Sequence, residues 1–128
     1  MKKLLGLCAA AVFAFSVFAG EFPDVSIKEL KKALADKKVT LIDVNGTESF
    51  QKGHIPSAID FESNEEKLAK MLPEDKSALI VAYCGGPKCM AYKQAAKVAE
   101  GLGYKNVKHL SAGISGWKDA GEKTDKAK

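Results

Sequence analysis

The sequence predicts an α/β protein with an open, mainly parallel sheet and helices on both of its faces. Short apolar runs rich in β-branched residues, at 39–42 and 77–83, alternate with amphipathic stretches, and this alternation is typical of parallel strands joined by helices. Polar or small residues follow three expected strands, at Asp43, Cys84 and 111–113. A length of 128 residues, of which 46% are hydrophobic, is enough for one domain with a modest core.

The N-terminal half is expected to begin with a short strand and a capped helix. Asp24-Val25 is the candidate strand, and residues 26–29 have the serine and glutamate of a capping box, so a helix should run from about Ile27 to Ala35. The apolar run 39–42 predicts a buried strand that ends at Asp43. The other elements expected in this half are helical turns at 47–52, a turn at 54–57, a short strand at 58–61 and a helix at 65–72 capped by Asn64.

The C-terminal half is expected to hold the centre of the sheet. The run at 77–83 predicts the central strand. Residues 91–102 predict an amphipathic helix that Gly101 and Gly103 terminate. The last segments are a strand at 107–110, a short helix at 114–120 and a charged, disordered tail at 122–128.

Residues 1–19 have the pattern of a secretory signal peptide. Two lysines form a basic start, an apolar run extends to Phe18, and Ala19 is a small residue at the expected cleavage site. An uncleaved membrane anchor and a lipoprotein signal at Cys8 are alternatives that the flanking residues support less. We therefore expect an exported protein, periplasmic or secreted, with its domain at 20–121 and no stable membrane association after cleavage.

The charge balance gives no support for nucleic-acid binding. The chain has 20 lysines and 16 acidic residues, a net charge of +4, and loss of the two leader lysines reduces it to +2. No basic block precedes the lysine-rich tail. His54 and His109 each lack a second ligand at metal spacing, so we expect neither a metal nor an organic cofactor.

Cys84 is the candidate nucleophile. It follows a predicted buried strand, and a loop that contains Gly85, Gly86, Pro87 and Lys88 leads from it to the helix predicted at 91–102. Unpaired N–H groups and the positive end of the helix dipole favour a thiolate in such a loop and bind an oxyanion or persulfide on the sulfur. The glycines permit a tight curl with inward amides, and the lysine adds positive charge.

Several segments of the chain, in order, resemble the single-domain rhodanese family. They are Leu41–Val44, Gly53–Ile59, the strand, loop and helix around Cys84, Leu102–Tyr104 with Val107, and Leu110–Ile114 with Trp117. The resemblance spans about residues 22–121 and implies a three-layer α/β/α fold with a short-stranded, five-stranded sheet. It also implies a sulfurtransferase, in which Cys84 takes sulfane sulfur from a donor such as thiosulfate, holds it as a persulfide, and passes it to a thiophilic acceptor. The N–H groups of residues 85–89, that of Cys89 included, would hold the persulfide, except that Pro87 has none.

The loop departs from the family pattern at Cys89. The family usually has arginine at this position, five residues after the cysteine, and this chain contains no arginine at all. Asn45 likewise stands where the family often has arginine. Lysine offers a point charge and not a planar fork, so Lys88 compensates only in part and we expect low thiosulfate turnover. The same absence disfavours the related phosphatases, which must stabilise the transferred phosphoryl oxygens.

Cys89 leaves several functions open. One interpretation is that it is only a small buried residue at the helix start. Another is that it is a resolving thiol, which turns a Cys84 persulfide into a disulfide with release of hydrosulfide, and a third is that it is half of a thiol–disulfide couple. A rhodanese-fold module that binds without turnover is a further alternative. The expected partners are small sulfur-containing anions or thiols, together with a redox or sulfur-acceptor protein.

Three other residues are assigned supporting roles. Asp43 orients the active-site loop or bonds backbone amides at the strand end. His54 holds its turn by hydrogen bonds or serves as a general base. Trp117 anchors the closing helix in the core, with a secondary role as a wall of the pocket. His109, within the last strand, is expected to be exposed or packed.

Overall fold

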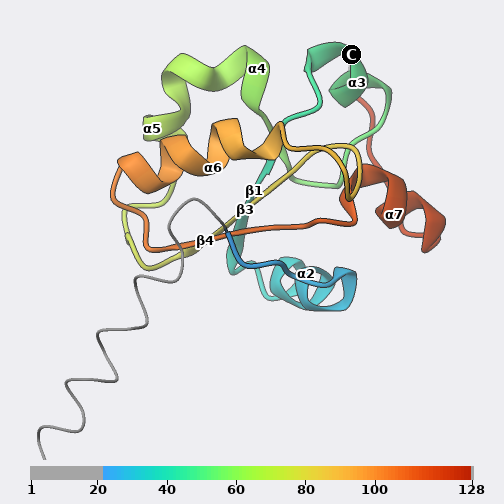
Figure 1. The fold of residues 1–128 in the computed structure, drawn as a ribbon, viewed down its shortest axis with the longest axis horizontal. Helices are drawn as coiled ribbons and strands as arrows, with labels where there is room; N and C mark the ends of the chain where they lie inside the picture. Colours follow the sequence, from blue (N-terminus) through green and yellow to red (C-terminus); the bar gives the residue numbers. More distant parts are fainter. Residues whose placement is uncertain (1–21, 128) are drawn as a thin grey trace, which may run out of the picture.

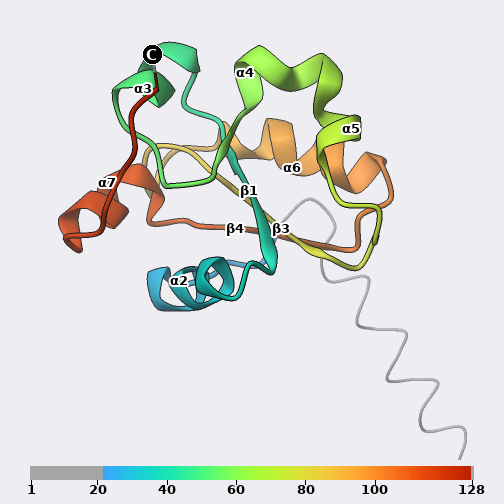
Figure 2. The ribbon, with the colours of Figure 1, turned by 180° about the vertical axis from the view of Figure 1, so that it is seen from behind.

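The computed structural model describes residues 22–127 and is built on a parallel sheet (Figures 1 and 2). The leader predicted at 1–19 lies outside the described residues. The four strands have the order β2-β1-β3-β4, and every pair is parallel. Their bounds are Val39–Asp43 for β1, Ile59–Asp60 for β2, Leu79–Tyr83 for β3 and Asn106–His109 for β4.

The fifth strand that the family resemblance implies is reduced to a single bridge. Asp24 pairs in parallel with His109 at the outer edge of β4. Two backbone bonds flank this pair, Val25 N–H to His109 O at 2.8 Å and His109 N–H to Pro23 O at 2.9 Å. The segment therefore occupies the place of a fifth strand, and the predicted class of fold is confirmed.

Helices cover both faces of the sheet, with α4, α5 and α6 above it and α2 below it in Figure 1. None of the helices within residues 22–127 is long and apolar enough to cross a bilayer. The helices are α2 (Ile27–Ala35), α3 (Thr47–Lys52), α4 (Phe61–Asn64), α5 (Leu68–Met71), α6 (Tyr92–Gly101) and α7 (Gly113–Asp119), with a 3-10 turn at Glu65–Lys67.

The core consists of two apolar clusters, one on each face of the sheet. Side chains alternate along β3, so Ile80 and Ala82 pack with Ala95 of α6, whereas Val81 packs with Trp117 of α7. Successive residues of a strand point to opposite faces. The continuous apolar run of the central strand is thus explained by burial on both sides.

One predicted helix is confirmed in full, and another only in part. The helix expected at 65–72 is present in two pieces, a 3-10 turn at Glu65–Lys67 and α5 at Leu68–Met71, and Asn64 makes no capping bond to it. Its side-chain amide donates to Asp60 O at 2.9 Å, a local bond that competes with helix propagation. By contrast, the Ser26–Glu29 capping box forms in both directions, and α2 spans the predicted 27–35.

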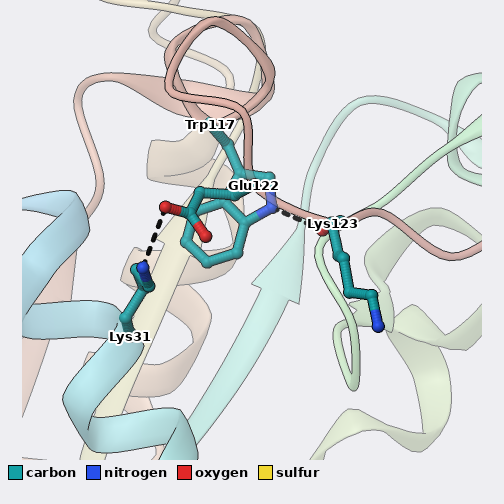
Figure 3. A network of polar contacts seen from close by, with 4 residues as sticks. All are labelled: Lys31, Trp117, Glu122 and Lys123. Atoms are coloured by element: carbon teal, nitrogen blue, oxygen red, sulfur yellow. Dashed lines mark hydrogen bonds and ion pairs between the residues drawn. The ribbon is translucent and has the colours of Figure 1, made fainter.

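The C-terminal tail, predicted to be disordered, packs against the domain over residues 122–127. The buried Trp117 donates its indole N–H to Lys123 O at 2.7 Å, and Glu122 pairs with Lys31 of α2 at 2.9 Å (Figure 3). A buried indole N–H needs an acceptor, and the backbone after α7 supplies it. This requirement explains why a stretch that is polar in composition is ordered.

The end of the tail reaches the turn between α3 and β2. His54 and Asp125 exchange two backbone bonds of 2.9 Å in an antiparallel bridge. Ala127 N–H then donates to Gln51 O at 3.1 Å. Segments from the middle and the end of the sequence are thereby joined.

Candidate active site

Cys84 lies at the carboxyl end of β3, and α7 holds the loop that follows it. The side chain is 3% exposed. Ile114 N–H donates to Cys84 O and Ser115 N–H to Gly85 O, both at 3.0 Å. The first free amides of α7 therefore bind the carbonyls of the loop.

Gly113, the first residue of α7, allows this close approach. Its φ of +65° is in the left-handed region, and a Cβ added there would lie 2.5 Å from the carbonyl carbon of Gly85 and 2.6 Å from Gly86 N. Only glycine meets both conditions without strain. The predicted motif at 111–113 thus serves to dock the cysteine loop against α7.

Three amides of the loop remain available to a ligand. Within residues 22–127, the N–H groups of Gly85, Gly86 and Lys88 donate no hydrogen bond. Pro87 has no N–H, and Cys89 N–H donates to Gly86 O at 3.1 Å. The amide of Cys89 therefore closes the turn and is not part of the anion cradle predicted at residues 85–89. The other three amides can still bind an anion.

Cys84 and Cys89 form a disulfide in this structure. Their Cα atoms are 6.3 Å apart, within the range that disulfides span. The sequence left this pairing open, because the path of a five-residue loop cannot be read from spacing alone. Cys84 has no free thiol in this state, so reduction must precede any nucleophilic chemistry.

A cavity of about 170 Å³ adjoins the disulfide, and an aromatic wall borders it. Tyr92 and His109 stack with centroids 4.1 Å apart, and Phe22 meets Tyr92 edge-on at 6.4 Å. His109 Nδ1 lies 3.1 Å from Phe22 O. A carbonyl only accepts, so Nδ1 carries the hydrogen and Nε2 is the basic nitrogen in the neutral ring.

Sequence reasoning did not find this wall. Its residues are far apart in the sequence, and His109 was expected to be exposed or packed. The available signal was topological: the carboxyl ends of parallel strands meet at one sheet edge, and His109 ends the strand beside that of Cys84.

Lysines provide the positive charge near the cavity. Lys93 lines it from the first turn of α6, and Lys88 is exposed on the loop. Neither makes an ion pair within the described residues. The cavity therefore has one ammonium group on its lining, that of Lys93, and a second lysine on the adjoining loop. An ammonium group attracts an anion but does not hold it in the fixed geometry of a guanidinium fork.

Asp43, the last residue of β1, lies in a buried network. Its carboxylate accepts from Tyr83 Oη at 2.6 Å and from Asn45 N–H at 2.8 Å, while Ile55 N–H donates to Tyr83 Oη at 3.0 Å. Burial raises the pKa of the Asp43 carboxyl, against the effect of these hydrogen bonds. Burial and the neighbouring carboxylate raise the pKa of Tyr83. The network joins the segments after β1 and before β2 to the central strand.

His54 and Trp117 do not line the cavity beside Cys84. His54 is buried, its ring stacks on Phe50 with centroids 3.7 Å apart, and its Nδ1 lies 2.8 Å from Phe50 O. Trp117 belongs to the core cluster on the opposite face of the sheet from Cys84. The contacts of His54 fit the role of holding its turn, and the place of Trp117 fits the role of a core anchor for α7.

The fold and the loop define a class: a parallel α/β domain with a cysteine between its central strand and the next helix. Comparison with known proteins identifies the family. The rhodanese-like domain model matches residues 26–120, and the chain therefore belongs to the rhodanese-like domain family.

Two curated relatives and one solved structure illustrate the range of similarity. An HTH-type transcriptional regulator, Rv0324 of Mycobacterium tuberculosis, is 36% identical over 93% of this chain, which spans about half, 52%, of the regulator's length. The thiosulfate sulfurtransferase GlpE of Shewanella oneidensis is 29% identical over 77% of the chain and 95% of its own length. The human single-domain sulfurtransferase TSTD1 is 27% identical, with a TM-score of 0.61 over 76% of this chain and 96% of that one.

Proposed function

We propose that the reduced protein is a sulfurtransferase or sulfur carrier that holds sulfane sulfur on Cys84. The observation that carries the proposal is the placement of this cysteine: a strand end, beside a cavity, next to three unpaired amides. Relatives that carry the name sulfurtransferase over nearly their whole length support it.

The reaction needs one nucleophile and a site for negative charge. The Cys84 thiolate attacks the outer sulfur of thiosulfate, a bond forms between the two sulfurs, and sulfite leaves with the electron pair of the broken S–S bond. The amides of Gly85, Gly86 and Lys88 stabilise the thiolate and then the terminal sulfur of the persulfide. A thiol or another thiophile then takes up that sulfur.

Donor binding relies on lysine. Lys88 and Lys93 attract the thiosulfate dianion, but ammonium groups fix its orientation less than a bidentate guanidinium does. We therefore propose a small sulfur-containing anion as donor with modest turnover, and a thiol or sulfur-acceptor protein as partner. The leader at 1–19 supports an exported protein, in a compartment where thiols tend to oxidise.

Mass analysis of the Cys89→Ser variant tests the proposal, because this variant cannot close the disulfide. Trypsin cuts after Lys88 and so separates peptide 77–88, which contains Cys84, from peptide 89–93. After thiosulfate treatment and alkylation, peptide 77–88 should gain about 32 Da, the mass of one sulfur atom. No gain on this peptide, or an equal gain by a Cys84→Ser protein, would contradict the proposal.

The disulfide itself favours a second candidate, a thiol–disulfide couple of Cys84 and Cys89. Such a protein exchanges two electrons with a partner dithiol and needs no sulfane donor. Oxidised wild-type protein would then oxidise a reduced dithiol in the absence of thiosulfate. The Cys89→Ser variant would neither exchange electrons in this way nor retain sulfur.

A further inference from the structure

We infer that Cys89 resolves the persulfide on Cys84, so that the protein releases the transferred sulfur as hydrosulfide and closes the disulfide seen here. This inference rests on the proposed function and adds a product and a co-reactant to it. Its structural basis is the Cys84–Cys89 bond, which joins the two Sγ atoms directly. Cys89 therefore reaches the inner sulfur of a persulfide, the atom that belongs to Cys84.

The resolving step balances without an oxidant. The Cys89 thiolate attacks Cys84 Sγ, a bond forms between these two sulfurs, and the bond to the outer sulfur breaks. The outer sulfur leaves with the electron pair as hydrosulfide. The sulfane sulfur is reduced, and the two cysteines are oxidised to the disulfide. In the closed loop that results, α7 holds the carbonyls of Cys84 and Gly85.

Return to the dithiol state requires an external dithiol, and exposure determines which sulfur it attacks. Cys84 is 3% exposed, whereas Cys89 is only partly buried, and its neighbours Lys88 and Met90 are exposed. Attack at Cys89 forms a mixed disulfide there and releases Cys84 as a thiolate. The unpaired amides of the loop favour Cys84 as the leaving group, because groups that stabilise a thiolate speed its departure.

A second attack within the mixed disulfide completes the cycle. The other thiol of the dithiol displaces Cys89, which recovers its hydrogen, and the dithiol leaves as its own disulfide. In sum, thiosulfate and a dithiol become sulfite, hydrogen sulfide and a disulfide. The class of reaction that must support this site is therefore dithiol reduction, and its partner docks at the Cys89 side of the loop.

The first test compares reduced, desalted wild-type protein with Cys89→Ser after addition of thiosulfate, without any other reductant. We expect wild type to release one sulfite and one hydrosulfide per chain and to end about 2 Da below its reduced mass. The Cys89→Ser variant should release sulfite only and retain about 32 Da on peptide 77–88.

The two proposals fail in different ways in this test. If wild type also retains the added sulfur and releases no hydrosulfide, the resolving role of Cys89 is wrong while the proposed function stands. If Cys89→Ser retains no sulfur, the proposed function itself fails. Cys84→Ser is the matched control, since it keeps Cys89 but should release neither product.

A second test locates the attack of the reductant. Oxidised wild type is treated with a limiting amount of glutathione, quenched with iodoacetamide and digested with trypsin. We expect the glutathionyl group on peptide 89–93 and the carbamidomethyl group on peptide 77–88. The reverse distribution would show that Cys84 is attacked and would overturn the assigned order.

Discussion

Replacement of Gly113 by alanine tests how closely α7 approaches the cysteine loop. The residue has φ +65°, and the added Cβ would lie 2.5 Å from the carbonyl carbon of Gly85. A left-handed alanine costs about 1–2 kcal/mol, and forcing atoms into a packed site adds about 1–3 kcal/mol. The variant should therefore lose about 2–5 kcal/mol of unfolding free energy, a large share of the usual 5–15 kcal/mol.

Urea denaturation of oxidised protein measures this loss, and two other glycines provide matched controls. Gly121 has φ +79° but open space around it, so Gly121→Ala should lose only the backbone part, about 1–2 kcal/mol. Gly101 is the last residue of α6 with no atom near its added Cβ, and Gly101→Ala should gain about 0.4–1 kcal/mol. Equal losses for Gly113→Ala and Gly121→Ala would refute the close contact with the loop.

Three further variants test the buried network, the donor site and the tail. Burial raises the pKa of Asp43, so its ionisation costs stability as pH rises through the folded-state pKa. In urea titrations, the stability of wild type relative to Asp43→Asn should therefore increase as the pH is lowered from about 7 to about 4, and no change would contradict this. Lys93→Gln should raise the KM for thiosulfate about fivefold, since an exposed ion pair contributes about 1 kcal/mol, while Lys97→Gln on the exposed face of α6 leaves it unchanged. Trp117→Phe should lose about 1–3 kcal/mol in thermal or urea unfolding, because Lys123 O loses its donor; a loss below this range would mean that the tail contact is not needed.

The elements that were predicted well depend on local sequence signals. The capping box of Ser26 and Glu29 acts within one helical turn, and α2 has the predicted bounds. The position of Cys84 at a strand end was predicted for the same reason, because strand, loop and helix are contiguous around it. The helix at 65–72 is broken and lacks its expected cap because the Asn64 side chain bonds Asp60 O instead.

The features that were missed depend on contacts between distant segments. The aromatic wall joins Phe22, Tyr92 and His109, which no local pattern connects. The tail was expected to be disordered from its composition, but its order depends on the indole of Trp117 and the backbone of His54. The Cys84–Cys89 disulfide required the path of the loop, which spacing does not specify.

The contacts of the tail also affect when the domain can complete its folding. His54 finds its backbone partner only after Asp125 has been synthesised, and Gln51 depends in the same way on Ala127. The turn between α3 and β2 thus lacks these partners until residues 125–127 have been synthesised. A precursor that crosses a membrane as an extended chain would benefit from this delay, since premature folding would block its passage.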